Sequence, residues 1–233
     1  ATVVVGIFGT TISPYLFFCQ SSEEIEDMRA KKAKPLLVDH TAAAGELSRI
    51  RWDTWGGMLF SNLVAYVVIL TTALTLHPSG ITDVQTAMQA AQALRPLAGD
   101  LAFYLFAAGI IGVGMLAVPV LAGSAGYALA ETMGWRWGLE VSARQAGRFY
   151  GIIVISMLVA LGLGFTKINP IKALFYSAVI NGVVAVPLIV LILILAARAS
   201  VLGPYRLRGM LLGLGWLAAA VMALSVAGML IPS

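Results

Sequence analysis

The sequence predicts an all-α polytopic membrane protein with about six transmembrane helices, the first of which is discontinuous. Hydrophobic residues make up 60% of the 233 positions and charged residues only 11%, whereas about a quarter of the residues in a soluble domain are charged. The apolar residues gather in runs long enough to cross a bilayer, which takes about 17–25 residues per helix. Ser13-Pro14 interrupts the first of these runs, and proline breaks the hydrogen-bond ladder of a helix.

Six apolar runs are expected to span the membrane. They cover residues 1–18, 56–76, 101–122, 149–165, 171–197 and 210–231. We interpret the whole chain as one transmembrane domain, residues 1–233, made of a broken helix over 1–27, a cytoplasmic loop over 28–52 and further spans over 53–233. Between the second and third spans, Thr82 or Asp83 is expected to cap a short helix that Pro96 limits.

The basic residues predict how the spans are oriented. Of the 15 lysines and arginines, all except Arg95, Lys167 and Lys172 lie in the first loop or in the connections after the third and fifth spans. By the positive-inside rule these segments are cytoplasmic, so the first span enters from outside. The net charge of +4 therefore reflects membrane topology. The expected partner is the lipid bilayer, and no nucleic-acid partner is expected.

The beginning of the chain predicts that it belongs to a longer protein. Residue 1 is Ala, and the sequence starts inside an apolar run. This run lacks the basic segment and the small-residue cleavage site of a signal peptide. We therefore expect N-terminal helices of the same protein, missing from this chain, as a further partner.

The segment around Ser13-Pro14 offers oxygen ligands for a hard cation. Pro14 lacks a backbone N–H and disfavours helical geometry at Ser13, so carbonyl groups near Thr10 and Thr11 lose their helical partners. The end of the first half-helix adds partial negative charge. Carbonyl and hydroxyl oxygens suit magnesium, calcium or manganese, and transporters with discontinuous helices bind ions in this way. The alternative is a proline that only kinks a membrane helix.

Three stretches resemble one family. "GTTISPYLFFCQS", residues 9–21, resembles the sixth helix of the NRAMP divalent-metal transporters, where the motif reads G-A-T-V-M-P-H-N-L-F-L-H-S. "VINGVVAVP", residues 179–187, is similar to the tenth helix, and "AVPVLAGSAGYALAETMGW", residues 117–135, to the eighth. The resemblance covers nearly the whole chain as helices six to eleven. It implies part of a LeuT-type fold in a bacterial inner membrane.

The resemblance also implies an activity and a site. It implies a transporter rather than an enzyme, with a divalent metal ion as substrate and no cofactor. The backbone carbonyl of Thr10 and the side chain of Ser13 would bind the metal. Ser13 stands where the family has a methionine, as in the magnesium-transporting and divergent bacterial branch. Because a soft thioether is replaced by a hard oxygen, magnesium or manganese is expected in preference to soft metals.

Other polar residues are interpreted from the same resemblance. Tyr15 and Gln20 replace the two histidines of the family motif, and this argues against proton coupling because histidine titrates near neutral pH. Four residues are expected to line the pathway: Thr11, Tyr15, Gln20 and Asn181. Asn181 could instead hold neighbouring helices together.

Four acidic residues lie near the end of the broken helix. They are interpreted as a solvated helix end, with a cation funnel as the alternative: Glu23, Glu24, Glu26 and Asp27.

Two other functions stay open at this stage. The first is a LeuT-fold transporter of an organic solute, whose polar group the broken helix would hold. The second is a non-transporting membrane sensor or assembly subunit that kept the fold without the metal site. The loss of the family's methionine, both histidines and the glutamine, at Ser13, Tyr15, Gln20 and Ala178, favours the second function, whereas the break at Ser13-Pro14 argues against it.

Overall fold

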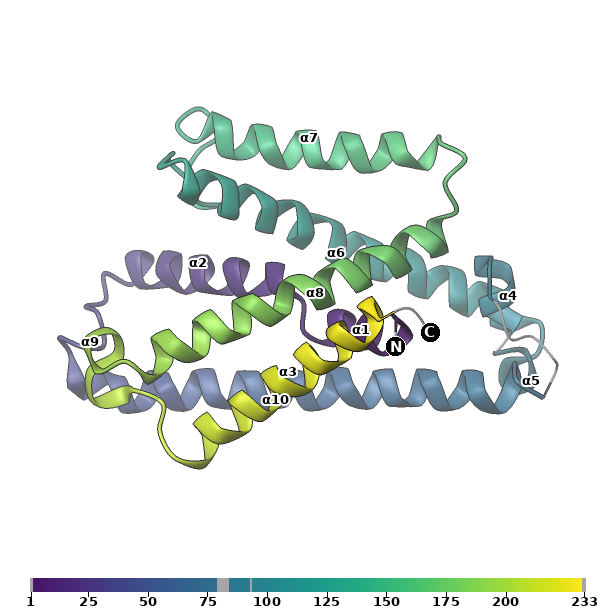
Figure 1. The fold of residues 1–233 in the computed structure, drawn as a ribbon. Coiled ribbons are helices and arrows are strands. Elements are labelled where there is room, and N and C mark those ends of the chain that lie inside the picture. The colour runs from purple at the N-terminus through teal and green to yellow at the C-terminus, as the bar shows by residue number, and fades with distance from the viewer. Residues whose placement is uncertain (1, 79–83, 93, 232–233) are drawn as a thin grey trace. The chain divides into compact units, whose positions relative to one another are not determined.

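The computed structural model describes residues 2–78, 84–92 and 94–231, so the expected caps Thr82 and Asp83 lie outside it. Over the described residues the chain is helical and contains no strand (Figure 1). Six helical segments, with the broken first helix taken as one, are long and apolar enough to cross a membrane. The prediction of an all-α polytopic membrane protein with a discontinuous first span is confirmed.

The chain divides into two compact units, each described by itself. The first unit consists of Ala1–His40, Gly138–Ser142 and Ala173–Ser233. It contains α1 (Thr2–Thr11), α2 (Pro14–Ala30), nearly all of α8 (Pro170–Ala197), α9 (Ala199–Leu202), the short turn η1 (Gly203–Tyr205) and α10 (Met210–Leu230). The prediction of a single domain over the whole chain stays a prediction.

Small residues let the helices of the first unit approach closely. A Cβ atom built on Gly215 of α10 would lie 2.5 Å from the Leu193 side chain of α8. A Cβ atom on Gly182 of α8 would lie 2.5 Å from the carbonyl oxygen of Val5 in α1. Membrane helices have no hydrophobic force to drive them together, and they associate by such close backbone packing.

The second unit consists of Thr41–Trp137 and Ala143–Lys172. Its helices are α3 (His40–Thr75), α4 (Ala87–Gln92), α5 (Arg95–Ala98), α6 (Leu101–Thr132) and α7 (Gly147–Gly164). Helices α6 and α7 lie side by side (Figure 1). Tyr127 of α6 is fully buried, and its ring contacts those of Phe149, at 5.0 Å between centroids, and Trp137, at 5.7 Å. These rings hold the C-terminal end of α6 against the start of α7.

The loop expected over residues 28–52 is shorter in the structure. Helix α2 continues to Ala30, and α3 already begins at His40. The polar segment before the apolar run is helical because it is rich in alanine, the strongest helix former. Arg49 also pairs with Glu46 at 2.9 Å and with Asp53 at 3.7 Å, one turn away on either side. Ion pairs at this spacing stabilise a helix.

The connection between the second and third spans also differs from the expectation. Two short helices, α4 and α5, replace the single expected one. Thr86 Oγ1 accepts the Gln89 N–H at 3.2 Å, and Gln89 Oε1 accepts the Thr86 N–H at 3.2 Å. This reciprocal arrangement is a capping box at the start of α4. Pro96 lies in the first turn of α5, where its missing N–H costs nothing, so it begins a helix rather than ending one.

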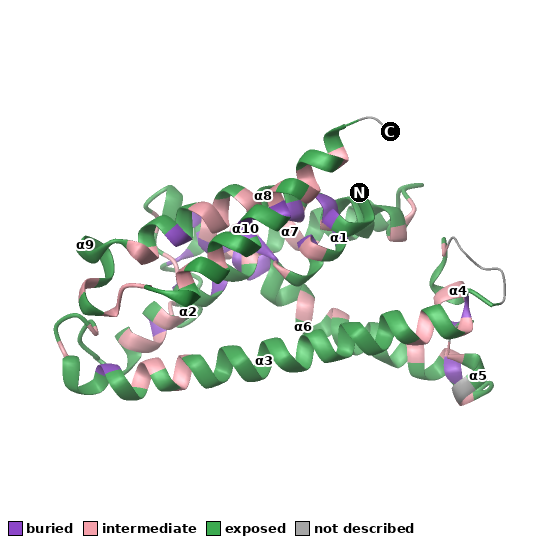
Figure 2. Cartoon of the chain, turned by 60° about the horizontal axis from the view of Figure 1, so that its bottom comes forward, coloured by how far each residue is buried: buried purple, intermediate pink, exposed green. Residues whose placement is uncertain are grey.

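Helix α3 is exposed along nearly its whole length (Figure 2), and from Trp55 onward it is mostly apolar. Leu59 and Phe60, for example, are 72% and 70% exposed. A soluble protein rarely exposes an apolar surface of this length. The surface of α3 is that of a helix surrounded by lipid or by further membrane helices.

Candidate metal site at the break between α1 and α2

The break lies between Thr11, the last residue of α1, and Pro14, the first residue of α2. Ser13 has extended backbone angles, φ −88° and ψ 108°, and its side chain is buried. In a continuous helix the carbonyl of Thr10 would accept the N–H of the residue four positions later. That residue is Pro14, which has no N–H. The sequence therefore frees the carbonyl of Thr10 from its helical partner.

The two predicted metal ligands lie together in the structure. The Ser13 hydroxyl donates to the Thr10 carbonyl, with 3.2 Å between the two oxygens. Neighbouring ligand oxygens in an octahedral magnesium site lie about 3 Å apart, and those in a calcium site about 3.3–3.7 Å apart, as follows from their metal–oxygen distances. The pair can thus bind one hard cation once the hydroxyl proton turns away from the carbonyl.

The threonine hydroxyls are directed along α1. Thr10 Oγ1 donates to the Gly6 carbonyl at 2.9 Å, and Thr11 Oγ1 donates to the Ile7 carbonyl at 2.9 Å. Such bonds to the preceding turn are the usual way for threonine to satisfy its proton within a helix. Their oxygens keep lone pairs, but neither hydroxyl donates into the break. The contribution of Thr10 to the site is its backbone carbonyl.

Helix α8 crosses α1 one turn before the break. A Cβ atom on Gly9 would lie 1.9 Å from the Ala178 carbonyl oxygen and 2.5 Å from the Gly182 backbone nitrogen. Only glycine at position 9 permits this contact. The crossing places Asn181, which precedes Gly182 and is half-buried, on the helix that packs against α1. Among the described residues, no hydrogen bond joins the Asn181 amide to the break.

Tyr15 and Gln20 both lie on α2, but the structure does not bring them together. Five positions of an α-helix correspond to a rotation of about 140°, so the two side chains occupy different faces. Tyr15 is half-buried beside the break, whereas Gln20 is exposed. Their assignment to the pathway stays a prediction.

The sequence agrees with one family along its length. The model of the family described as "Natural resistance-associated macrophage protein-like", or Nramp, matches residues 1–232.

This chain belongs to the Nramp family.

The resemblance seen in the sequence is thereby confirmed. A protein of Deinococcus radiodurans, named divalent metal cation transporter MntH, is 24% identical over 222 residues, which are 95% of this chain and 47% of the relative. A protein of the same name from Xanthomonas campestris is 31% identical over 127 residues, which are 52% of this chain and 26% of that relative. This Nramp chain thus spans about half the length of the Deinococcus relative.

Sequence reasoning missed the role of Glu26 in this Nramp chain. Its side chain is buried, with 9% exposed, rather than solvated. Both carboxylate oxygens accept the backbone N–H of Leu139, at 3.2 and 3.1 Å. Gly138, with φ 133°, brings the loop close, because a Cβ atom there would lie 3.1 Å from Oε1. Asp27, by contrast, is half-exposed and pairs with Lys31 at 2.6 Å, as expected for a helix end.

The site at the break consists of neutral oxygens. Among the described residues, no group of three or more His, Cys, Asp or Glu side chains could hold a metal ion. The partial charge at the C-terminal end of α1 helps to bind a cation, but a divalent ion normally has carboxylate ligands as well. The Thr10 carbonyl and the Ser13 hydroxyl could therefore supply only part of a coordination shell.

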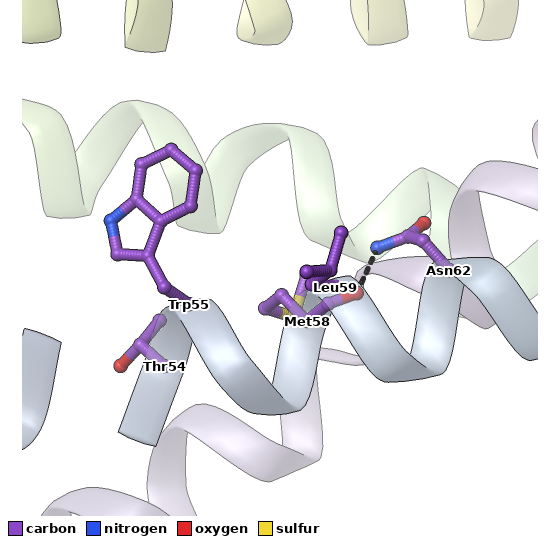
Figure 3. Close-up of a pocket in the computed structure, with 5 residues that line it drawn as sticks. All are labelled: Thr54, Trp55, Met58, Leu59 and Asn62. Carbon is purple, nitrogen blue, oxygen red and sulfur yellow. Dashed lines mark hydrogen bonds between the residues drawn. The ribbon is translucent and has the colours of Figure 1, made fainter. Parts of the chain in front are cut away.

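A hollow of about 370 Å³ lies along α3 (Figure 3). The figure labels its lining residues, all from α3: Thr54, Trp55, Met58, Leu59 and Asn62. The Asn62 amide donates to the Met58 carbonyl of its own helix at 2.7 Å. None of the lining side chains is charged, so the hollow offers no ligand set for a cation.

Proposed function

We propose that this chain is part of a secondary transporter that carries a divalent metal cation across a bacterial inner membrane. The observation that carries the proposal is the pair of oxygens at the break, the Thr10 carbonyl and the Ser13 hydroxyl, 3.2 Å apart in a membrane span. Family membership and the printed names of the two relatives support it. The metal ion is the substrate rather than a cofactor.

The mechanism follows from the chemistry of the break. The ion exchanges part of its water shell for the two protein oxygens, and a carboxylate from outside the break supplies the compensating charge. In transporters with discontinuous helices, one helix bundle rocks against another around such a site and exposes it to each side in turn. Thr11, Tyr15, Gln20 and Asn181 would line the path of the ion. Neither position 15 nor position 20 carries a histidine, the side chain suited to carrying protons near neutral pH, so transport would proceed without proton transfer through these positions.

Ser13 would decide which metal is carried. A hydroxyl oxygen is a hard ligand, which suits magnesium and manganese, whereas a thioether favours softer metals such as cadmium. Ser13 is buried at the break and lies beside the Thr10 carbonyl, which supports this role. We therefore propose magnesium or manganese as the substrate.

Uptake into liposomes tests the proposal. The full-length protein and its Ser13→Met variant are reconstituted, and the initial rates of magnesium, manganese and cadmium uptake are measured. We expect the parent to carry magnesium or manganese, and the Ser13→Met variant to shift its preference at least about tenfold toward cadmium, an effect of about 1.4 kcal/mol.

The matched control is Ser21→Met. Ser21 lies on α2 and is exposed, and among the described residues its hydroxyl bonds only to the Phe18 carbonyl of its own helix, so its replacement should leave the metal preference unchanged. An equal shift in both variants would contradict a role of Ser13 as a ligand. If the parent carries none of the three ions down a steep gradient, the proposal fails. Competition with organic solutes would then test the alternative substrate class.

A further inference from the structure

A cavity of about 480 Å³ lies where the connection after α6 meets the start of α7. Both helices and this part of the connection belong to the second unit. Arg136 and Arg148 line the cavity together with Trp135, Gln145 and the backbone of Gly147. Among the lining residues, all of which the structure describes, no side chain is acidic. The cavity therefore presents positive charge and hydrogen-bond donors.

The two arginines are available to a ligand. Both are exposed, and within the described ranges neither guanidinium is paired with a carboxylate. The guanidinium of Arg148 lies over the ring of Trp135, 5.2 Å from its centroid. This cation–π contact restricts the guanidinium without using its N–H groups. Arg148 is thus held in position with its hydrogen-bond donors free.

The first turn of α7 adds further donors to the same cavity. The helix begins at Gly147 and its N-cap is Ala146, which offers no side-chain cap. No acidic residue lies in the first turn. The amide groups and the positive end of the helix dipole at this terminus favour an anion. Two guanidinium groups and a helix N-terminus around one cavity match the charge and the acceptor oxygens of a phosphate.

The surroundings of the cavity indicate which phosphate it binds. The arginines and Trp135 lie at the end of a span that the positive-inside rule places at the cytoplasmic boundary, where tryptophan is also enriched. Beyond the first turns, α7 exposes a strongly apolar surface, with Val154 and Ile155 53% and 61% exposed. A ligand with a phosphate and acyl chains can contact both the arginines and the apolar surface of α7, whereas a free phosphate can contact only the arginines.

We propose that this cavity binds the phosphate headgroup of an anionic lipid in the cytoplasmic leaflet. Basic pockets between membrane helices on the cytoplasmic side are suited to such headgroups. The guanidinium groups of Arg136 and Arg148 bind the phosphate oxygens, and the Gln145 amide and the first amides of α7 donate to the remaining ones. The inference is independent of the ion that the protein carries.

Native mass spectrometry of the full-length protein tests the proposal. The protein, purified in neutral detergent, is titrated with phosphatidylglycerol and with phosphatidylcholine. We expect phosphatidylglycerol to bind more tightly than phosphatidylcholine. The double variant R136Q/R148Q should weaken phosphatidylglycerol binding about 25-fold without changing phosphatidylcholine binding. This expected loss of affinity is the product of a factor of about five for each of the two arginines near an anionic surface. The charge-conserving R136K/R148K should retain most of the affinity.

Arg144 provides the matched control, because it lies in the same connection but does not line the cavity. R144Q should bind phosphatidylglycerol like the parent. Unchanged binding in R136Q/R148Q, or an equal loss in R144Q, would overturn the proposal. A parallel titration with inorganic phosphate separates the two possible sources. If inorganic phosphate alone bound as tightly as phosphatidylglycerol, the lipid assignment would be overturned in favour of a soluble anion.

Discussion

The carbonyl of Thr10 lacks its helical N–H partner because of a single residue, Pro14. Replacement of Pro14 by alanine would restore an N–H four positions after Thr10, and alanine favours a continuous helix. We therefore expect Pro14→Ala to abolish most metal uptake by the full-length protein while leaving its melting temperature equal or higher. Initial uptake rates in liposomes and thermal melting of the same preparation measure the two effects.

The control is Pro187→Ala, which removes a proline from inside α8 without touching the break. If Pro14→Ala carried metal at the parental rate, the freed carbonyl would have no part in transport. Loss of uptake in both variants would point to a general need for flexible helices.

At the scale of single residues, the sequence was informative where a rule of local geometry applies. The freed carbonyl follows from the position of Pro14, and the Ser13–Thr10 pair spans only three positions. The partner of Glu26 could not be found in this way, because Leu139 lies 113 positions away. That hydrogen bond exists only through tertiary packing. Nothing in the local sequence distinguishes the buried Glu26 from the solvated acidic residues around it.

At the scale of elements, the Glu26 carboxylate joins the C-terminal half of α2 to the loop at Gly138–Ser142. A hydrogen bond to a charged acceptor contributes about 1.5–3 kcal/mol, so Glu26→Ala should lower the free energy of unfolding by roughly that amount. Chemical denaturation of the full-length protein in detergent would measure it. Since α2 carries one side of the break, the variant should also show altered uptake rates.

Glu23→Ala serves as the control for Glu26→Ala. Glu23 is exposed, and its carboxylate accepts only the weak S–H donor of Cys19, at 3.3 Å, among the bonds described for it. We expect a change in stability well below that of Glu26→Ala. Equal losses in the two variants would mean that the acidity of this helix end matters, rather than the bond to Leu139.

The elements themselves could be predicted to different degrees. Hydropathy located all six spans, because burial in lipid requires an apolar run of fixed length. It placed the start of α3 too late, since hydropathy detects the membrane segment and not the helix. The segment from His40 to Asp53 is helical through its alanines and the pairing of Arg49. The capping box at Thr86 and Gln89 was present in the sequence as a Thr-x-x-Gln pattern.

At the scale of the whole molecule, charge decides what this chain can do by itself. Its two proposed metal ligands, the Thr10 carbonyl and the Ser13 hydroxyl, are neutral, and moving a divalent ion out of water without a counter-charge is unfavourable. The chain spans about half the length of its Deinococcus relative, 47%. We therefore expect the 233-residue chain, reconstituted alone, to show no saturable magnesium or manganese uptake. The full-length protein in matched liposomes should show it.

Comparing uptake by the 233-residue chain with uptake by the full-length protein also tests where the negative charge that balances the metal ion comes from. If the chain alone carried metal with saturable kinetics, a carboxylate from outside the break would be unnecessary. The acidic residues of α2 would then be the candidates to supply the charge, starting with Glu23, which is exposed on the helix that follows the break. Uptake that depends on the full length would instead mean that the Thr10 carbonyl and the Ser13 hydroxyl select the ion, while its charge is balanced elsewhere in the protein. Selection and charge compensation would then lie on different helices, and relative movement of those helices would change the affinity for the ion.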